Sequence, residues 1–543
     1  MSYLRVTSLD LWVIVFYFFV IIANGIYQSV RKTKGGDDFL LGGKSFGIFS
    51  TLCTQGATMK GSSALVGYSA GAYVNGASVL ISSQCYSLGA WIAVMSGIAR
   101  KIKKCSNTIE IRSAGDIFLR RFGSETLKKL VGLGGTWMSL SILSSNMAAI
   151  GLLVHLMFGK YGLTYEYSLI LGVCVAVAYT AIGGLVSVVY NDVLQWCIMM
   201  PLIFFLFPYA LVTKCGVTPE ALHSTLNAAK YFSLQPNLWW FGFLLGGILA
   251  ACCDVSHLTR FITAKDEKTA VTGSMFGFTF CVLLAGFVVF FGLSAAMLIE
   301  PSVLGDNKDG AIFALISRAL SPGFVGLMLA AILAATISTI DSNLQTAVLC
   351  TMIDIVEPSL PKNTTEKQKL LYCRLITVVI AVLSIFFVLK VKGIIAIIGI
   401  GFNVYSSAIF FPLMSCMFWK KATAKGLITG IVVGAVTAVV TVSMKLPLPI
   451  VWGVSFSAIS TIVISWLTAG EKSIKPLLPG FNESGQKIDS DIFKACFLGA
   501  SGSLILSIGI GTWVNWIYII IGTILMFLCI KMLDSAFKRV AAN

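Results

Sequence analysis

The sequence predicts an all-α polytopic membrane protein, and its composition and hydropathy pattern carry this prediction. Of the 543 residues, 57% are hydrophobic and only 12% are charged, with a mean hydropathy of +0.88. Soluble domains carry about 25% charged residues, so the composition argues against a soluble protein. Apolar runs of about 20 residues recur from end to end, and a helix of that length crosses a bilayer with its own backbone polar groups satisfied.

About fifteen transmembrane helices follow from these runs. The first run is too long and too aromatic for the core of a signal peptide and has no small-residue cleavage pattern after it, so we expect it to be retained. The predicted spans are 11–30, 46–67, 78–99, 130–157, 166–187, 192–213, 238–257, 272–298, 322–352, 371–389, 394–418, 424–444, 449–468, 493–512 and 515–533.

Basic residues alternate between loops and thereby predict the orientation. With the N-terminus outside and the C-terminus in the cytoplasm, the cytoplasmic loops hold thirty of the 40 Lys and Arg residues and the external segments hold nine. Such an excess of cytoplasmic basic residues is typical of multi-pass proteins, so we expect a multi-pass protein of the cell membrane. Because the net charge of +16 is spread over alternate loops, we expect no nucleic-acid partner. The remaining basic residue, Lys60, lies inside the span 46–67.

The sequence lacks the usual signals of several function classes. The 14 cysteines lie mostly within apolar segments and form no CxxC pair, which favours buried thiols over disulfides or a metal site. Without a Walker motif the sequence does not support ATP-driven transport, and we expect no enzymatic reaction. We also see no appended soluble domain, which counts against a sensor, and no repeated charged filter residues, which counts against a channel.

The spans between residues 46 and 418 divide into two blocks of five, 46–213 and 238–418. An odd number of spans per block places the start of the second block on the opposite side of the membrane, so the blocks can be inverted repeats. Residues 1–45 would add an N-terminal helix and the first cytoplasmic loop. Residues 419–543 would add C-terminal helices and a cytoplasmic tail.

The first span of each block has a composition that favours an interrupted helix. In many secondary transporters, substrate and ions bind where these helices are broken, near the bilayer midplane. Glycine also permits close packing of unbroken membrane helices, which is the alternative explanation. The residues that we expect near such breaks, and as candidates for a substrate cavity, are Lys60, Gly61, Ser62 and Ser63 in the first block and Asp254 and His257 in the second.

Two groups of polar residues are candidates for cation binding. Ala335, Ser338 and Thr339 are spaced i, i+3 and i+4, so their oxygens share one helical face and could bind a small hard cation. The alternative is that both hydroxyls bond to carbonyls of their own helix. Asp341, one turn further on, is a carboxylate that lipid would not tolerate unpaired. Asp192 is either a helix N-terminal acid or a waypoint for a cation entering the cytoplasm.

Five segments together resemble the sodium/solute symporter family over residues 35–420. They are DFLLGGKS at 38–45, the Gly- and Ser-rich span that ends at Gly67 with Tyr73 and Gly76 after it, IGGLVSVVYNDVLQ at 182–195, RFITAKD at 260–266, and AAILAATISTIDSNLQ at 330–345 followed by Asp354 and Ile355. The ordered set is far more specific than any one motif.

This resemblance implies a LeuT-type fold, a five-plus-five inverted-repeat core with flanking helices that works by sodium-coupled alternating access. Na⁺ is then the coupling ion, and the bilayer and a small organic solute are the partners, with the protein a monomer or a loosely associated oligomer. By the same resemblance, Asp192 corresponds to the aspartate of the cation exit path. The sodium ligands implied are the carbonyls of Ala57 and Lys60, the carbonyl of Ala335, and the hydroxyls of Ser338 and Thr339.

Lys60 is the main departure from the family pattern, which usually has an apolar residue at this position. Three interpretations are open: its side chain pairs with Asp254 or Asp341, it binds an anionic group of the substrate, or it occupies the cation site. A buried lysine can also lose its proton, so the last interpretation allows a Na⁺-independent or H⁺-coupled carrier.

Further departures concern the substrate and the neighbouring helices. Asn191 and Thr259 stand where threonine and glutamine are usual, and small residues replace the polar sugar-binding side chains at Ala64, Gly247 and Ala250. A sugar substrate is therefore disfavoured. We expect Na⁺-coupled symport of a small organic solute, preferably one with a carboxylate, and the alternatives are a Na⁺-independent carrier and a transporter-like sensor.

Overall fold

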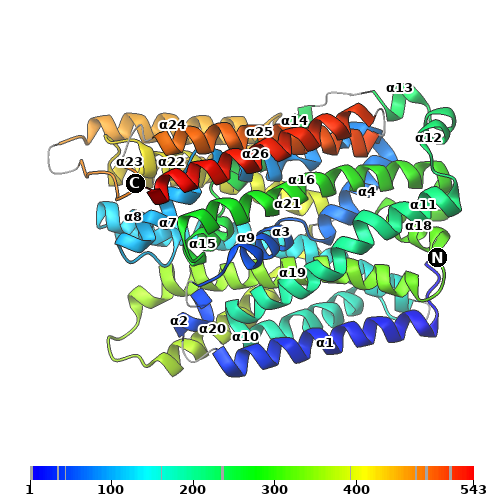
Figure 1. Ribbon diagram of the computed structural model, residues 1–543. Coiled ribbons are helices and arrows are strands. Elements are labelled where there is room, and N and C mark those ends of the chain that lie inside the picture. Colours follow the sequence, from blue (N-terminus) through cyan, green and yellow to red (C-terminus); the bar gives the residue numbers. More distant parts are fainter. Residues whose placement is uncertain are drawn as a thin grey trace.

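Long helices, most of them aligned along one common axis, make up the computed structural model (Figure 1). It describes residues 4–32, 36–42, 45–159, 162–233, 238–391, 393–470, 474–482, 487–512 and 516–542. Within these residues, 13 helices are long and apolar enough to cross a membrane. The only strand-like pairing in the described chain is a single β-bridge between Phe46 and Ala264, which joins the segment before α3 to the segment after α15.

The helices of the first half precede residue 232. They are α1 (Ser8–Lys32), α2 (Gly36–Leu41), α3 (Ile48–Met59), α4 (Ser62–Asn75), α5 (Val79–Ser83), α6 (Cys85–Met95), α7 (Ile98–Thr108), α8 (Ala114–Phe122), α9 (Glu125–Phe158), α10 (Tyr165–Pro201), α11 (Phe207–Cys215), α12 (Pro219–Thr225) and α13 (Ala228–Tyr231). Short 3-10 and π-helical turns, η2 (Gly76–Ser78) and η4 (Leu202–Leu206), connect some of them.

The second half is also helical throughout its described residues. Its helices are α14 (Leu238–Cys252), α15 (Val255–Thr263), α16 (Glu267–Leu298), α17 (Pro301–Leu304), α18 (Ala311–Ala319), α19 (Phe324–Leu349), α20 (Glu366–Lys390), α21 (Ile394–Tyr405), α22 (Phe411–Phe418), α23 (Ala424–Ser443), α24 (Pro449–Leu467), α25 (Lys487–Thr512) and α26 (Trp516–Ala542). The turns η5 (Lys308–Gly310), η6 (Cys350–Val356), η7 (Glu357–Ser359) and η8 (Ser406–Phe410) belong to this half, and η6 and η8 are π-helical.

Both interruptions expected in the first spans of the two blocks are confirmed. The predicted span 46–67 divides into α3 and α4 at Lys60 and Gly61. Within the predicted span 238–257, α14 ends at Cys252 and α15 begins three residues later, at Val255, directly after Asp254. Glycine marks the first break, at Gly61, whereas Gly246 and Gly247 lie inside α14 and the second break falls at Cys253 and Asp254.

The boundaries between other predicted spans differ from the structure. The spans predicted at 166–187 and 192–213 correspond to two helices within α10, which meet at the non-helical Gly184 (φ 65°, ψ −169°), so the boundary lies a few residues earlier than predicted. A side chain at position 184 would be strained at this φ, and its Cβ would lie 2.7 Å from the backbone oxygen of Phe39. Because no polar residue marks this break, a hydropathy profile locates it only approximately.

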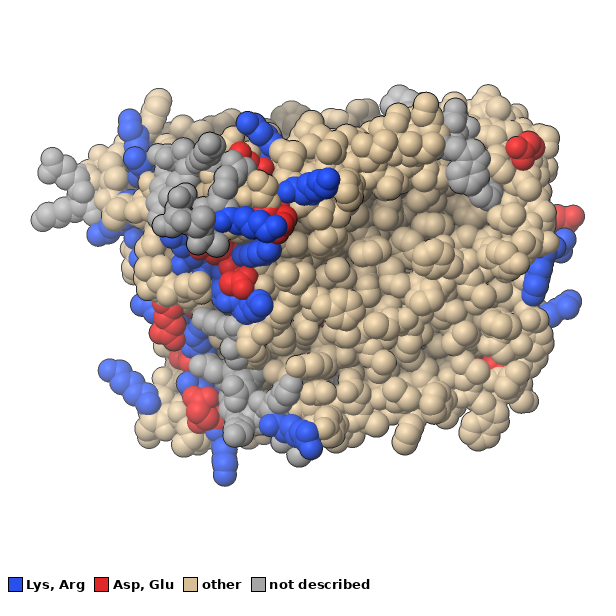
Figure 2. All heavy atoms as spheres, in the orientation of Figure 1, with Lys and Arg blue, Asp and Glu red and all other residues tan. Residues whose placement is uncertain are grey.

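The two ends of the bundle differ in charge. Figure 2 shows that Lys and Arg side chains gather at one end, which we call the basic end, while the middle of the visible face is almost free of charge. Helices α7 and α8 lie at the basic end together with the C-terminus, and the N-terminus lies at the opposite end (Figure 1). Termini at opposite ends require an odd number of crossings. Large apolar side chains such as Trp12, Phe205 and Trp466 face outward, as they would toward lipid.

Helix α1 is attached to α19 through the buried carboxylate of Asp10. The N–H and hydroxyl of Thr7 donate to Oδ2 of Asp10 at 2.9 and 2.6 Å, so Asp10 closes the first turn of α1. The N–H groups of Gly323 and Gly326, at the start of α19, donate to Oδ1 at 2.7 and 2.6 Å. One carboxylate thus satisfies free backbone donors at the start of α19 while it anchors α1.

We expect Asp10→Ala to destabilise the protein by about 2–4 kcal/mol, because it leaves these buried N–H groups without an acceptor. The measurement is the midpoint of thermal unfolding of the purified protein in detergent. Asp306→Ala, in an exposed loop, is the matched control and should leave the midpoint in place. Equal midpoints for both variants would show that the Asp10 contacts contribute nothing.

Candidate cation and substrate site

The break between α3 and α4 frees a carbonyl at the centre of the bundle. Because α3 ends at Met59, the carbonyl of Ala57 has no partner in a following helical turn. Close packing forces the chain to be glycine here, since a Cβ on Gly61 would lie 2.1 Å from Oδ1 of Asn146 and 2.6 Å from Oγ1 of Thr339. The break therefore lies in direct contact with α9 and α19.

Four oxygens converge beside this break. The hydroxyls of Ser338 and Thr339 donate to the Ala57 carbonyl at 3.3 and 3.0 Å, and both also lie 3.0 Å from the Ala335 carbonyl. The structure thus brings together the predicted pair of hydroxyls and the two carbonyls, all of them buried. Oxygens that bind one hard cation at about 2.4 Å lie roughly 3.4 Å apart when adjacent, so this spacing suits such a cation.

Lys60 follows α3 directly, with a backbone that has left the helical conformation (φ −126°, ψ 78°). Its ammonium donates to the carbonyl oxygen of Ser83 at 2.5 Å and lies 5.5 Å from the centre of the Tyr68 ring. Within the described residues it has no recorded contact with a carboxylate. The carboxylates considered as partners are engaged elsewhere: Asp254 accepts from the Ser256 N–H at 2.6 Å, and Asp341 accepts from the Thr180 hydroxyl at 2.6 Å.

A small cavity adjoins the Lys60 side chain. Its volume is about 40 Å³, whereas pockets that hold organic ligands measure roughly 300–1,000 Å³. The cavity therefore has to enlarge before a solute can enter. The residues that line it come from both sides of the break and from neighbouring helices: Thr58, Met59, Lys60, Gly61, Ser63, Ala64, Tyr68, Tyr86, Ile142, Asn146, Thr339 and Ile398.

The candidates from the second block lie outside this lining. Asp254 caps the N-terminus of α15, and Nδ1 of the buried His257 is 2.8 Å from Oε1 of Gln55 on α3. Both residues therefore hold the second break in place and do not line the cavity next to Lys60. The side chain of Ser62 lies outside the described part of the chain.

Asp192 is fully buried and contacts Thr54, which precedes Ala57 by three residues on α3. It lies two turns beyond the break at Gly184, so it is not the acid of a helix N-terminus as one of the two sequence interpretations had it. Its Oδ2 accepts from the hydroxyl of Thr54 at 2.6 Å, and the same hydroxyl accepts from Nε of Arg260 at 3.1 Å. A carboxylate, a hydroxyl and a guanidinium thus form a buried chain that links α10, α3 and α15.

Sequence reasoning missed several residues of this region. Thr54 and Arg260 were not singled out, although an arginine six residues beyond a predicted break is a signal, because charges inside spans need partners. Tyr68, Tyr86 and Asn146 gave no signal, since aromatic and amide side chains occur throughout membrane helices. Only the fold shows that these three face Lys60.

Comparison with known proteins places the chain in a family. The model of the sodium:solute symporter family matches residues 39–434. The sodium/proline symporter of Escherichia coli is 26% identical over 445 residues, which cover 78% of this chain and 86% of that protein. The sodium/pantothenate symporter of Haemophilus influenzae is 23% identical over 444 residues, with 78% and 88% covered.

Solved structures show the same fold. A Na⁺-coupled sialic acid symporter in a substrate-bound outward-open state matches with a TM-score of 0.71 and 20% identity, covering 87% of this chain and 99% of that chain. Mhp1, a nucleobase-cation-symport-1 family transporter, matches with a TM-score of 0.52 and 12% identity, covering 84% and 98%. The expected LeuT-type fold is thereby confirmed. With the family match extending over most of its length, the chain belongs to the sodium:solute symporter family.

Proposed function

We propose that this protein is a secondary active transporter that couples the entry of a small carboxylate-bearing solute to Na⁺ by alternating access. Family membership supports Na⁺ coupling, and the relatives named above are symporters of sodium with proline or with pantothenate. The solved structure with the higher TM-score is a Na⁺-coupled sialic acid symporter. Proline, pantothenate and sialic acid all carry a carboxylate.

The observation that carries the substrate class is the ammonium of Lys60. It is buried beside a cavity at the break of the first helix, and its recorded contacts are a carbonyl oxygen and an aromatic ring. Neither neutralises a buried positive charge, whereas a substrate carboxylate would do so through a charge-assisted hydrogen bond. The same contacts direct the ammonium toward Ser83 and Tyr68 and not toward the four oxygens, which favours substrate binding over replacement of the cation.

In this proposal Na⁺ is bound by the carbonyls of Ala57, Lys60 and Ala335 and the hydroxyls of Ser338 and Thr339. Asp192, which contacts Thr54 on the same helix as Ala57, lies on the path by which the cation leaves. The basic end faces the cytoplasm, in keeping with the positive-inside rule, so that the N-terminus is outside. Na⁺ and solute then bind at neighbouring sites beside the same helix break. When either ligand fixes the conformation of the break, binding of the other ligand becomes more favourable.

The experiment is uptake into proteoliposomes of a panel of small acids, including proline, pantothenate and sialic acid, with an inward Na⁺ gradient or with choline in its place. Uptake that is equal in Na⁺ and in choline, or driven by a proton gradient alone, would overturn Na⁺ coupling in favour of a Na⁺-independent or H⁺-coupled carrier. Absence of any uptake, together with solute-induced thermal stabilisation, would point to a sensor.

Lys60→Met separates the roles of the ammonium from those of the ion site. We expect the KM for the acid that the panel identifies to rise by roughly 10–100-fold, because a charge-assisted hydrogen bond is lost. Thermal stabilisation by Na⁺ alone should persist, since the backbone carbonyls remain. The control is Lys445→Met, in an exposed loop, which should leave KM unchanged. An unchanged KM in Lys60→Met would exclude the ammonium as the carboxylate site.

A further inference from the structure

Asp354 is a buried carboxylate at the end of the helix that carries Ser338 and Thr339. It lies in η6, the π-helical continuation of α19, and none of its surface is exposed. The hydroxyl of Ser113, the residue that caps α8, donates to Oδ1 of Asp354 at 2.5 Å. This hydrogen bond between a carboxyl group and a helix cap connects the end of α19 to the start of α8.

Two glycines allow this close contact. A Cβ on Gly115 of α8 would lie 2.6 Å from Oδ1 of Asp354, and a Cβ on Gly132 of α9 would lie 2.4 Å from the Cβ of Asp354. Neither distance is compatible with a side chain larger than hydrogen. Helices α8 and α9 therefore form a fitted recess for the Asp354 side chain.

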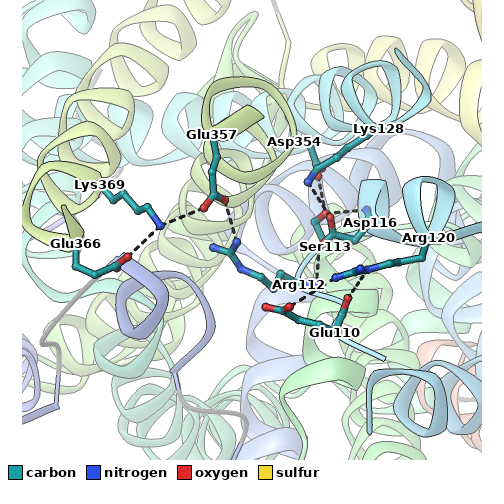
Figure 3. Close-up of polar contacts among 10 residues, drawn as sticks. All are labelled: Glu110, Arg112, Ser113, Asp116, Arg120, Lys128, Asp354, Glu357, Glu366 and Lys369. Atoms are coloured by element: carbon teal, nitrogen blue, oxygen red, sulfur yellow. Dashed lines mark hydrogen bonds and ion pairs between the residues drawn. The ribbon is translucent and has the colours of Figure 1, made fainter. Parts of the chain in front are cut away.

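Ion pairs surround this recess. Figure 3 shows Asp354, Ser113, Asp116 and Lys128 directed toward one another, and the Asp116–Lys128 pair, at 2.8 Å, is largely buried. The Asp116 N–H also donates to the Ser113 hydroxyl at 3.1 Å. Further out, Glu357 pairs with Arg112 at 2.9 Å and with Lys369 at 3.3 Å. The recess thus belongs to a polar cluster that joins α8, α9, α19 and α20.

The recess and the candidate site are two contact points of one antiparallel helix pair. Gly132 of α9 meets Asp354, Thr136 meets Thr351 with 3.1 Å between hydroxyls, and Asn146 and Thr339 both meet Gly61. Fourteen residues separate Gly132 from Asn146 on α9, and fifteen separate Thr339 from Asp354 on α19. At 1.5 Å per residue these distances are about 21 and 22 Å.

We propose that Asp354 is a positioning residue that sets the register of α19 against α9 and thereby places Thr339 opposite Asn146 and the break at Gly61. A helix transmits an axial displacement along its length, so a slip at the recess displaces the hydroxyls of Ser338 and Thr339 from Ala57 by a similar distance. The hydroxyl oxygens of Ser338 and Thr339 lie 3.3 and 3.0 Å from the Ala57 carbonyl oxygen, so an axial shift of about one ångström is enough to disrupt a shared cation site. This inference rests on the proposed binding of Na⁺ at these oxygens.

The test measures the Na⁺ concentration that gives half of the maximal thermal stabilisation by Na⁺, in purified protein without solute. We expect Asp354→Ala and Gly132→Ala to raise this concentration on the order of tenfold, as loss of support behind metal ligands commonly does. Asp354→Asn, which keeps an oxygen for Ser113, should have a smaller effect. Lys369→Gln, at the partly exposed edge of the cluster, is the control and should stay close to wild type.

The outcomes separate this inference from the function on which it rests. A wild-type protein without any response to Na⁺ would refute the proposed cation site. A wild-type response that is unchanged in the Asp354 and Gly132 variants would overturn the positioning role, even where their Na⁺-free unfolding midpoints fall, because the cluster then only stabilises the fold. If Asp354→Ala does not fold, Asp354→Asn and Ser113→Ala decide by the same criterion.

Discussion

Gly61→Ala is expected to abolish Na⁺-driven uptake in proteoliposomes, with a loss of at least about a hundredfold. The added methyl group would overlap Oδ1 of Asn146 at 2.1 Å and Oγ1 of Thr339 at 2.6 Å, so α4, α9 and α19 could not keep their present contact. Because the Thr339 hydroxyl also faces Ala57, the overlap displaces a proposed cation ligand and the wall of the Lys60 cavity together. A displacement of about one ångström can slow a step that depends on exact positioning by about a hundredfold.

Gly71→Ala is the matched control for this substitution. Gly71 lies inside α4, the helix that directly follows Gly61, and a Cβ there would meet Val79 at 3.4 Å, an ordinary van der Waals distance. Alanine also stabilises a helix interior relative to glycine. Uptake by Gly71→Ala should equal that of the wild type. Wild-type uptake by Gly61→Ala would show that the break is wider in the working protein than the contacts imply.

Thr339→Val is expected to raise the Na⁺ concentration for half-maximal uptake by roughly 10–100-fold, with a smaller effect on solute KM at saturating Na⁺. Valine keeps the shape of threonine but removes the oxygen that lies 3.0 Å from both Ala57 and Ala335 carbonyls. The measurement is initial uptake as a function of Na⁺ concentration. A rise in solute KM alone would instead assign the hydroxyl to the substrate.

Thr336→Val gives the comparison on the same helix. The Thr336 hydroxyl donates at 2.7 Å to the Ile332 carbonyl of its own helix, one turn away, and it does not line the cavity. Its removal should leave the Na⁺ dependence unchanged. If both variants raised the Na⁺ concentration for half-maximal uptake equally, buried threonine hydroxyls would support α19 in general. Thr339 would then have no special role in binding the cation.

The sequence could predict the local features of the site. Glycine and serine around Lys60 predicted the break, and the i, i+3, i+4 spacing predicted that Ala335, Ser338 and Thr339 share a face. Both signals are local, because they depend on the helix period and on backbone propensity. The assignment of these residues to Na⁺ came from family resemblance and stays a prediction.

Contacts between distant segments could not be predicted in this way. The hydroxyl of Thr54 bonds to Asp192, 138 residues away, and to Arg260, 206 residues away. Lys60 had two plausible carboxylate partners in the sequence, yet the fold directs its ammonium to a backbone carbonyl, which has no residue-specific signature. The break at Gly184 was located only approximately for a related reason, since the backbone that packs against it belongs to Phe39 in another helix.

The attachment of α1 has a consequence for biosynthesis. This helix leaves the ribosome long before its partners: the backbone donors that meet Asp10 lie 313 and 316 residues further along, and the side-chain amide of Asn191 that meets Asn24 lies 167 residues further along. Until α19 has been inserted, Asp10 lacks these partners and is stable only near water at the membrane surface. Helix α1 is thus made early but reaches its final place only after α19 has been made, and a nascent chain that stops before Gly323 lacks the contacts that fix α1.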